Sequence, residues 1–206
     1  MNTRITEIDL LRTIAIALMV IYHVAFDLWA FYDFDIDLFG NAWQTLRIIT
    51  ASLFLLVSGA SAQFSNRPFR RAGIVLGCAV LISIVTYIYD PDTFIYFGIL
   101  HCIGIGMLLL IPLKRFKELL IPLGILLLLL PTPNAPLPTL DYYPLIPWFG
   151  LMLIGSGLSH YLYIRNQFST FQHFNISKLT LPSRHALLIY MIHQPILLIV
   201  LAILNS

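Results

Sequence analysis

Charged residues are scarce in this chain. They make up 11% of its 206 residues, whereas hydrophobic residues make up 59%. A soluble domain carries about 25% charged residues, so this composition excludes an ordinary soluble protein. The basic residues fall in short segments between apolar runs rather than in one patch, which argues against nucleic-acid binding. The sequence therefore predicts an all-α, polytopic membrane protein.

Cysteine is also scarce, and several chemical motifs are missing. Cys78 and Cys102 are the only cysteines, and both lie within apolar runs without ligand or redox spacing around them. A disulfide framework and a cysteine-based metal site are therefore not expected, and both residues are interpreted as packing residues. The sequence contains no phosphate-binding glycine loop and no nucleophilic serine motif. We expect no metal.

Seven apolar segments predict a bundle of about seven transmembrane helices in one domain covering residues 1–206. The fifth segment is the weak one: its twelve residues span about 18 Å as a helix, against a hydrocarbon core near 30 Å. The segments are Leu10–Trp29, Trp43–Gln63, Ala72–Tyr89, Phe94–Ile111, Leu119–Leu130, Pro144–Ile164 and His185–Leu204.

The loops between these segments alternate in charge. Basic residues follow the second, fourth and sixth segments, and the intervening loops are acidic. The positive-inside rule then predicts a cytoplasmic N-terminus and a multi-pass protein of the cell (inner) membrane. The basic residues are Arg67, Arg70, Arg71, Lys114, Arg115, Lys117, Arg165, Lys178 and Arg184; the acidic ones are Asp33, Asp35, Asp37, Asp90, Asp92 and Asp141.

The first apolar segment contains three ionisable residues, Arg12, His23 and Asp27. On a helix, Arg12 and His23 point within about 20° of the same direction, and Asp27 lies about 40° round from His23. Arg12 and His23 are separated by roughly 16 Å along the axis. Ionisable groups in a membrane helix usually face a bundle interior or a wet cavity. Because a carboxylate can orient a neutral imidazole, His23 with Asp27 is a candidate general base.

Residues on other segments are candidates for the same site. His101 is predicted about 10 Å below the outer surface, at a depth close to that of His23, so the two could meet. Arg47 is the one basic residue on the outer side and needs an anionic partner, either a carboxylate or a substrate group. Asp141 and Trp148 lie near the outer entry to the sixth segment.

Structural roles remain open for all of these residues. Arg12 can reach a lipid headgroup, Asp27 can lie in the far interface, and Asp27 can pair with Arg47. His193, in the middle of the seventh segment, is better explained by a buried structural hydrogen bond than by chemistry.

Six motifs together resemble one family. In order they are EIDLLRTIAIALMVIYHVAFD, LFLLVSGAS, NRPFRRAG, FGILHCIGIG, DYYPLIPWFG and YMIHQPIL. They are similar to the small bacterial and archaeal relatives of heparan-alpha-glucosaminide N-acetyltransferase, from Arg4 to about Leu197. That family belongs with the wider transmembrane acyltransferases that carry an R-x10-H motif in the first helix. This chain has Thr13 where the family usually has glycine.

The resemblance implies transfer of an acyl group, usually acetyl, from cytoplasmic acyl-coenzyme A to a sugar or cell-envelope glycan across the membrane. The donor acyl-CoA, an amino-sugar or glycan acceptor and membrane lipid are the expected partners; a homodimer is left open. The residues and the resemblance together give His23, Asp27 and His101 as candidates for catalysis, Arg12, Arg67, Arg70 and Arg71 for the donor, and Arg47, Asp141 and Trp148 for the acceptor.

Two other functions are compatible with the residues. A transporter could carry protons or a small anion past His23 and His101. A non-catalytic membrane subunit could use the same polar residues only to pack its helices.

For an acyltransferase, direct attack of the acceptor on the thioester is favoured, and a transient acyl-histidine remains an alternative.

Overall fold

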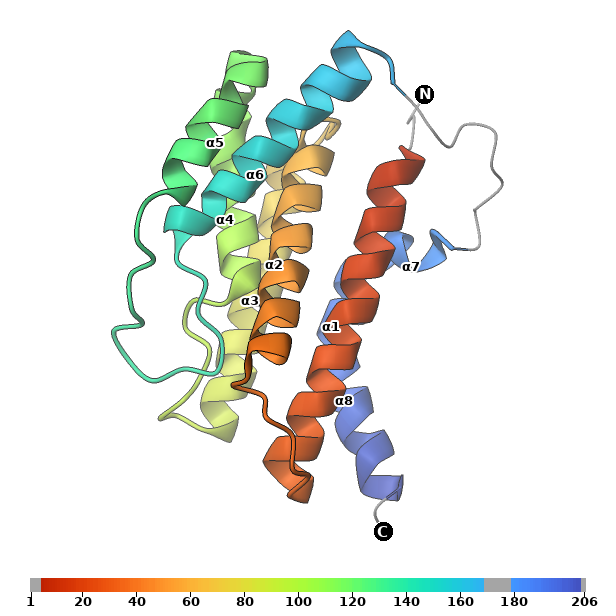
Figure 1. Ribbon diagram of the computed structural model, residues 1–206, viewed down its shortest axis with the longest axis vertical. Coiled ribbons are helices and arrows are strands. Elements are labelled where there is room, and N and C mark those ends of the chain that lie inside the picture. The colour runs from red at the N-terminus through yellow and green to blue at the C-terminus, as the bar shows by residue number, and fades with distance from the viewer. Residues whose placement is uncertain (1–4, 169–178, 205–206) are drawn as a thin grey trace. The chain divides into compact units, whose positions relative to one another are not determined.

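The computed structural model describes residues 5–168 and 179–204, and the regular elements within these ranges are all helices (Figure 1). The predicted all-α fold is thus confirmed. The helices are α1 (Thr6–Tyr32), α2 (Asn41–Ala62), α3 (Pro68–Tyr89), α4 (Ile99–Leu113), η1 (Lys114–Leu119), α5 (Leu120–Leu128), α6 (Leu145–Ser159), η2 (His160–Arg165), α7 (Leu181–Arg184) and α8 (Ala186–Leu204).

Six helical stretches in the described ranges are long and apolar enough to cross a membrane. The predicted fourth and fifth segments form a single one of them, Ile99–Leu128. This stretch is divided at Lys117, whose φ of 52° and ψ of −124° lie outside the helical region, so α4 and α5 are separate helices. With nine residues, α5 is about 14 Å long and is too short to cross the hydrocarbon core by itself.

The contacts divide the chain into two compact units. The first unit consists of Met1–Phe54 and Thr170–Ser206, and the second consists of Leu55–Ser169. Helix α2 contributes to both, because the boundary falls within it. Lys178, one of the predicted basic loop residues, lies outside the described ranges.

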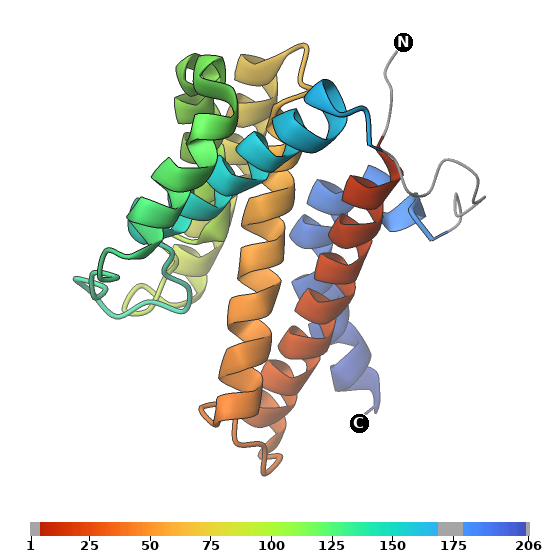
Figure 2. The ribbon, with the colours of Figure 1, turned by 45° about the horizontal axis from the view of Figure 1, so that its top comes forward.

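In the first unit, α8 lies beside α1 and runs in the same direction (Figures 1 and 2). Contacts between the two helices show this direction: His23 of α1 meets His193, and Asp27, one turn further on, meets Gln194. Small and apolar residues of α1, including Ala15 and Met19, are buried. The short helix α7 contacts the N-terminal part of α1 through Ser183. Helices α1 and α8 therefore form a parallel pair.

In the second unit, glycines allow α6 to approach its neighbours closely. A Cβ atom at Gly155 would overlap the carbonyl oxygen of Leu56 on α2, so only glycine fits there. Gly150 of α6 faces Gly124 of α5, and a Cβ atom at Gly150 would lie 2.5 Å from the Gly124 carbonyl oxygen. Small residues at such crossings are typical of membrane helix interfaces, where close packing drives association.

The two ends of the second unit differ in charge, as the loop pattern predicts. At one end, the ammonium group of Lys114 donates to the carbonyl oxygen of Ala62, where α2 ends and the arginines of α3 follow. Glu118 lies at the same end as the close of α6, because its carboxylate accepts from His160 at 3.0 Å. At the other end, which holds Asp90 and Asp92, the backbone N–H of Leu140 donates to the carbonyl oxygen of Thr93 at 3.0 Å, and the Thr93 hydroxyl donates to Asp90. The orientation of these ends relative to the cytoplasm stays a prediction.

Candidate functional site

Two histidines face each other between α1 and α8 in the first unit. The ring centroids of His23 and His193 are 4.5 Å apart, and the rings are almost perpendicular at 87°. Tyr22 and Tyr190 also place their rings against this pair, at 5.9 Å from His23 and 5.5 Å from His193 respectively. Two imidazoles are thus held in contact within membrane-spanning helices.

The backbone fixes the tautomer of both histidines. Nδ1 of His23 lies 2.9 Å from the carbonyl oxygen of Met19, and Nδ1 of His193 lies 2.7 Å from that of Tyr190. A carbonyl oxygen only accepts hydrogen bonds, so each Nδ1 carries the proton in the neutral ring. Each Nε2 therefore has a lone pair that can accept a proton. Both rings therefore have the same tautomer, with Nε2 as the basic atom.

Asp27 lies one turn beyond His23 and is completely buried. Its Oδ1 accepts a hydrogen bond of 2.5 Å from the amide nitrogen Nε2 of Gln194 on α8. The carbonyl of Met19, rather than the carboxylate of Asp27, is bonded to Nδ1 of His23. Asp27 therefore takes part in the same helix interface as His23 through Gln194.

The polar atoms left over in this interface are all hydrogen-bond acceptors. Within residues 5–168 and 179–204, Asp27 Oδ2, His193 Nε2 and Gln194 Oε1 are buried without a hydrogen-bond partner. Because Gln194 donates with its nitrogen, its remaining atom is the carbonyl oxygen. A buried acceptor without a donor is unfavourable by about 1–3 kcal/mol. We call Asp27, His193 and Gln194, together with His23, the acceptor cluster.

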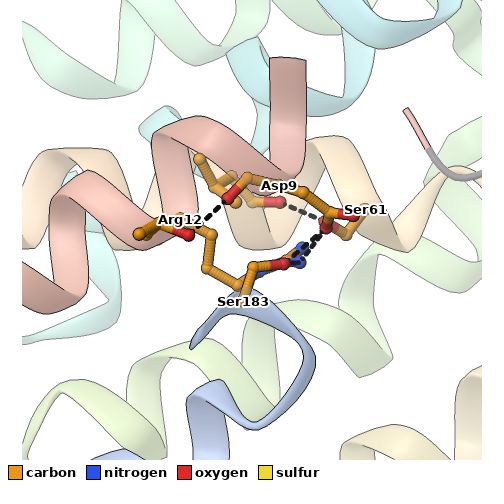
Figure 3. Close-up of polar contacts among 6 residues, drawn as sticks. Asp9, Arg12, Ser61 and Ser183 are labelled. Atoms are coloured by element: carbon orange, nitrogen blue, oxygen red, sulfur yellow. Dashed lines mark hydrogen bonds and ion pairs between the residues drawn. The ribbon is translucent and has the colours of Figure 1, made fainter. Parts of the chain in front are cut away.

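Near the start of α1, Arg12 contacts Asp9 and Ser183 within a network of polar contacts (Figure 3). Its Nη1 donates to Asp9 Oδ1 at 2.8 Å and to Ser183 Oγ at 3.1 Å. Ser183 in turn donates to Asp9 Oδ1 at 2.6 Å. The side chain of Arg12 is 21% exposed. The R-x10-H pair thus has its arginine held by α7 and its histidine held against α8.

His101 belongs to the second unit, where its ring caps the first turn of α4. The backbone N–H of Gly98 donates to its Nδ1 at 3.2 Å, so Nδ1 is the acceptor and Nε2 carries the proton. Nε2 lies 3.3 Å from Ser83 Oγ, which donates to the carbonyl oxygen of Ile95 at 2.6 Å. Both nitrogens of His101 therefore have structural partners. Its predicted meeting with His23 stays a prediction.

Asp141 and Trp148 stabilise the approach to α4 and α6. Asp141 Oδ2 accepts from the backbone N–H of Ile99 at 3.0 Å, which satisfies a free donor at the N-terminus of α4. The Trp148 ring packs edge-on against Tyr143, with centroids 5.0 Å apart. Asp141 is half-buried. Both side chains thus help to anchor the segment between α5 and α6.

The remaining predicted arginines divide between the two units. Arg47, half-buried on α2 in the first unit, donates from Nε to Gln44 Oε1 at 3.2 Å. Arg67, Arg70 and Arg71 are exposed at the start of α3 in the second unit, and none of them forms an ion pair with another described residue. The structure therefore leaves these three side chains accessible to an anion.

The contacts that His193 and Gln194 make with α1 were not predicted from the sequence. The expected structural hydrogen bond of His193 exists, to Tyr190, but the ring also contacts His23. A signal was present: His193 and Gln194 form a polar pair in the middle of an otherwise apolar segment. That pair is as unusual for a membrane helix as His23 and Asp27 are.

Comparison with known proteins identifies the family. The family model for heparan-alpha-glucosaminide N-acetyltransferase, catalytic, matches residues 4–195, which is most of the chain. Neither a search of curated proteins nor a search of solved structures found a match. The match includes every residue of the acceptor cluster and of the Arg12 network. The chain therefore belongs to the heparan-alpha-glucosaminide N-acetyltransferase catalytic family and is a multi-pass membrane acetyltransferase.

Proposed function

We propose that this protein transfers an acetyl group from acetyl-coenzyme A to the amine of an amino-sugar or glycan acceptor, with His23 as general base. The observation that carries the proposal is the acceptor cluster, in which two imidazoles present basic Nε2 atoms beside a buried carboxylate. The family match supports acetyl transfer. The donor, the acceptor and the role of each residue belong to the proposal.

The cluster favours an amine over a hydroxyl as the acceptor group. A protonated amine has three donors and no acceptor, whereas a hydroxyl has one donor and two lone pairs. Asp27 Oδ2, His193 Nε2 and Gln194 Oε1 are three buried acceptors. An ammonium group could therefore donate to Asp27 Oδ2 and His193 Nε2 while its third N–H donates to His23 Nε2, and the carboxylate would neutralise its charge.

The pair of histidines also matches the proton balance of amide formation. An ammonium nitrogen loses two protons when it becomes an amide, one before it attacks and one as the amide forms. His23 Nε2 takes one of them, and His193 Nε2 can take the other. The nitrogen bonds to the thioester carbonyl carbon, the carbon–sulfur bond breaks, and the coenzyme A thiolate takes one of the two protons. The second proton is released to solvent.

The donor is proposed to lie along α1. Arg12 would bind a phosphate of the coenzyme A, and the pantetheine arm would extend about 16 Å along the helix to His23. Arg67, Arg70 and Arg71 are exposed and would contribute further phosphate contacts. This placement requires the N-terminal end of α1 to face the cytoplasm, in agreement with the predicted charge pattern of an inner-membrane protein.

The acceptor is proposed to enter from the opposite side, where Arg47 and Asp141 were predicted to contact it. The bonds of Asp141 and His101 at the start of α4 support a structural part for both residues. A contact of Arg47, Asp141 or Trp148 with the acceptor stays a prediction, as does a catalytic part for His101.

Acetyl transfer by the purified protein in lipid nanodiscs tests the proposal. Radiolabelled acetyl-coenzyme A is supplied with glucosamine or with methyl glucoside, which has hydroxyls but no amine. We expect labelled product with glucosamine, much less with methyl glucoside, and binding of acetyl-coenzyme A by calorimetry. A wild-type protein that neither binds acetyl-coenzyme A nor transfers acetyl to either sugar would refute the proposed donor.

A further inference from the structure

The network around Arg12 has features that simple anchoring of a helix does not require. Asp9 and Arg12 are three residues apart on α1, so their side chains lie on the same face of the helix. A single carboxylate oxygen, Asp9 Oδ1, accepts from both Arg12 and Ser183. Arg12 Nη1 donates to both partners. These three bonds form a closed triangle (Figure 3).

A closed triangle restricts the guanidinium in position and in orientation. A free arginine side chain loses much rotamer freedom when it binds an anion, and that loss weakens binding. Here the position of Nη1 is already fixed by bonds of 2.8 and 3.1 Å. Arg12 therefore loses less freedom when a phosphate binds to it.

Ser183 links this preorganisation to α7. Ser183 is buried at 6% exposure, as is Thr180 at 7% just before α7 begins. The hydroxyl donates to Asp9 and accepts from Arg12, so it uses both of its hydrogen-bonding functions. An apolar side chain of the same size could pack in this place but could not complete the triangle.

We propose that Asp9 and Ser183 are positioning residues that hold Arg12 ready for a phosphate group of the acyl-coenzyme A donor. The inference rests on the proposed function, because it takes Arg12 as a donor ligand. Neither residue needs to touch the donor. Their effect is on the affinity for donors that carry phosphates, and it leaves the chemical step at His23 unchanged.

Calorimetry with two donors tests the inference. Acetyl-coenzyme A carries phosphates, whereas acetyl-pantetheine has the same thioester arm without them. The variants are Asp9→Ala, which removes the acceptor oxygen, and Ser183→Ala, with Ser183→Thr as the rescue, because threonine restores the hydroxyl. Thr13→Val is the matched control: its hydroxyl bonds the backbone carbonyl of Asp9 at 3.0 Å and does not take part in the triangle.

We expect Asp9→Ala and Ser183→Ala to raise the Kd for acetyl-coenzyme A about tenfold, and Ser183→Thr to restore it. The Kd for acetyl-pantetheine and the kcat at saturating donor should stay within about twofold of wild type, as should all values for Thr13→Val. If the Asp9 variant does not fold, the comparison of Ser183→Ala with Ser183→Thr decides the inference, because these two variants differ by only one hydroxyl and one methyl group.

Three results overturn the inference: an unchanged Kd for acetyl-coenzyme A, equal weakening of both donors, or no rescue by threonine. Equal weakening would show that the triangle only supports the fold. If wild type binds acetyl-coenzyme A and these variants bind equally well, the positioning role fails while the proposed function stands. If wild type does not bind acetyl-coenzyme A, both fail.

Discussion

Replacing Asp27 with asparagine tests the acceptor cluster with the smallest change in shape. Asparagine keeps a carbonyl oxygen that can accept the 2.5 Å hydrogen bond from Gln194, so the α1–α8 contact can persist. It replaces Oδ2, a buried acceptor, with an NH₂ group, which is a donor. The substitution also removes the negative charge that would balance an ammonium group.

The magnitude follows from the one bond that is lost. A hydrogen bond to a charged group contributes about 1.5–3 kcal/mol. Each 1.36 kcal/mol corresponds to a factor of ten, so the lost bond weakens amine binding about 10- to 150-fold. Because Asp27 is fully buried, solvent does not screen this interaction as it does at the surface. We expect the KM for glucosamine to rise by that factor.

The assay is the initial rate of radiolabelled acetyl transfer as a function of glucosamine concentration, with acetyl-coenzyme A held at saturation. The control is Asp33→Asn, which removes one carboxylate at the end of α1 from an exposed residue. Asp33 has a φ of 53°, and asparagine tolerates this left-handed conformation. An Asp27→Asn enzyme with a KM for glucosamine within about threefold of wild type would refute the assignment of Asp27 to amine binding.

Three further predictions concern the base, the packing and the cap. His23→Gln should lower kcat about 10²- to 10⁴-fold and leave the Kd for acetyl-coenzyme A unchanged by calorimetry; an unchanged kcat would contradict its role as base. Gly155→Leu should lower the thermal unfolding midpoint because its Cβ overlaps the Leu56 carbonyl, whereas Gly73→Leu, at a position with open space, should not; equal midpoints would contradict this packing. Asp141→Ala should lower stability by about 1 kcal/mol through loss of the α4 cap, measured by denaturant unfolding; unchanged stability with a raised KM for glucosamine would instead support the predicted substrate contact.

The helical architecture could be predicted because its causes lie along the sequence. Apolar run length sets the span of a helix, and loop charge sets which ends lie together. The weakness of the fifth segment was predicted from its length, but its cause was not, because the break at Lys117 is a backbone conformation that composition does not specify. Lys117 was assigned only to a basic loop.

The candidate site was predictable on one helix and much less so between helices. Helical periodicity alone places Arg12, His23 and Asp27 on one face. The partners of these residues come from α7 and α8, more than 160 positions later in the chain, and no periodicity connects such distant segments. Asp27 shows the consequence: local spacing suggested that it orients His23, whereas its bond in the structure is to Gln194 and the Met19 carbonyl holds His23.

The packing of α7 and α8 against α1 holds two side chains of α1 in fixed positions. Arg12 is held by the triangle with Asp9 and Ser183, and His23 is held by its backbone bond and by the ring of His193. The two points are eleven residues apart, so the helix sets their separation at about 16 Å and keeps both on one face. A donor bound by its phosphate at the first point would therefore present its thioester at a defined depth. Catalysis by positioning depends on such a fixed separation, because a misplacement of about 1 Å can lower a rate 10²-fold.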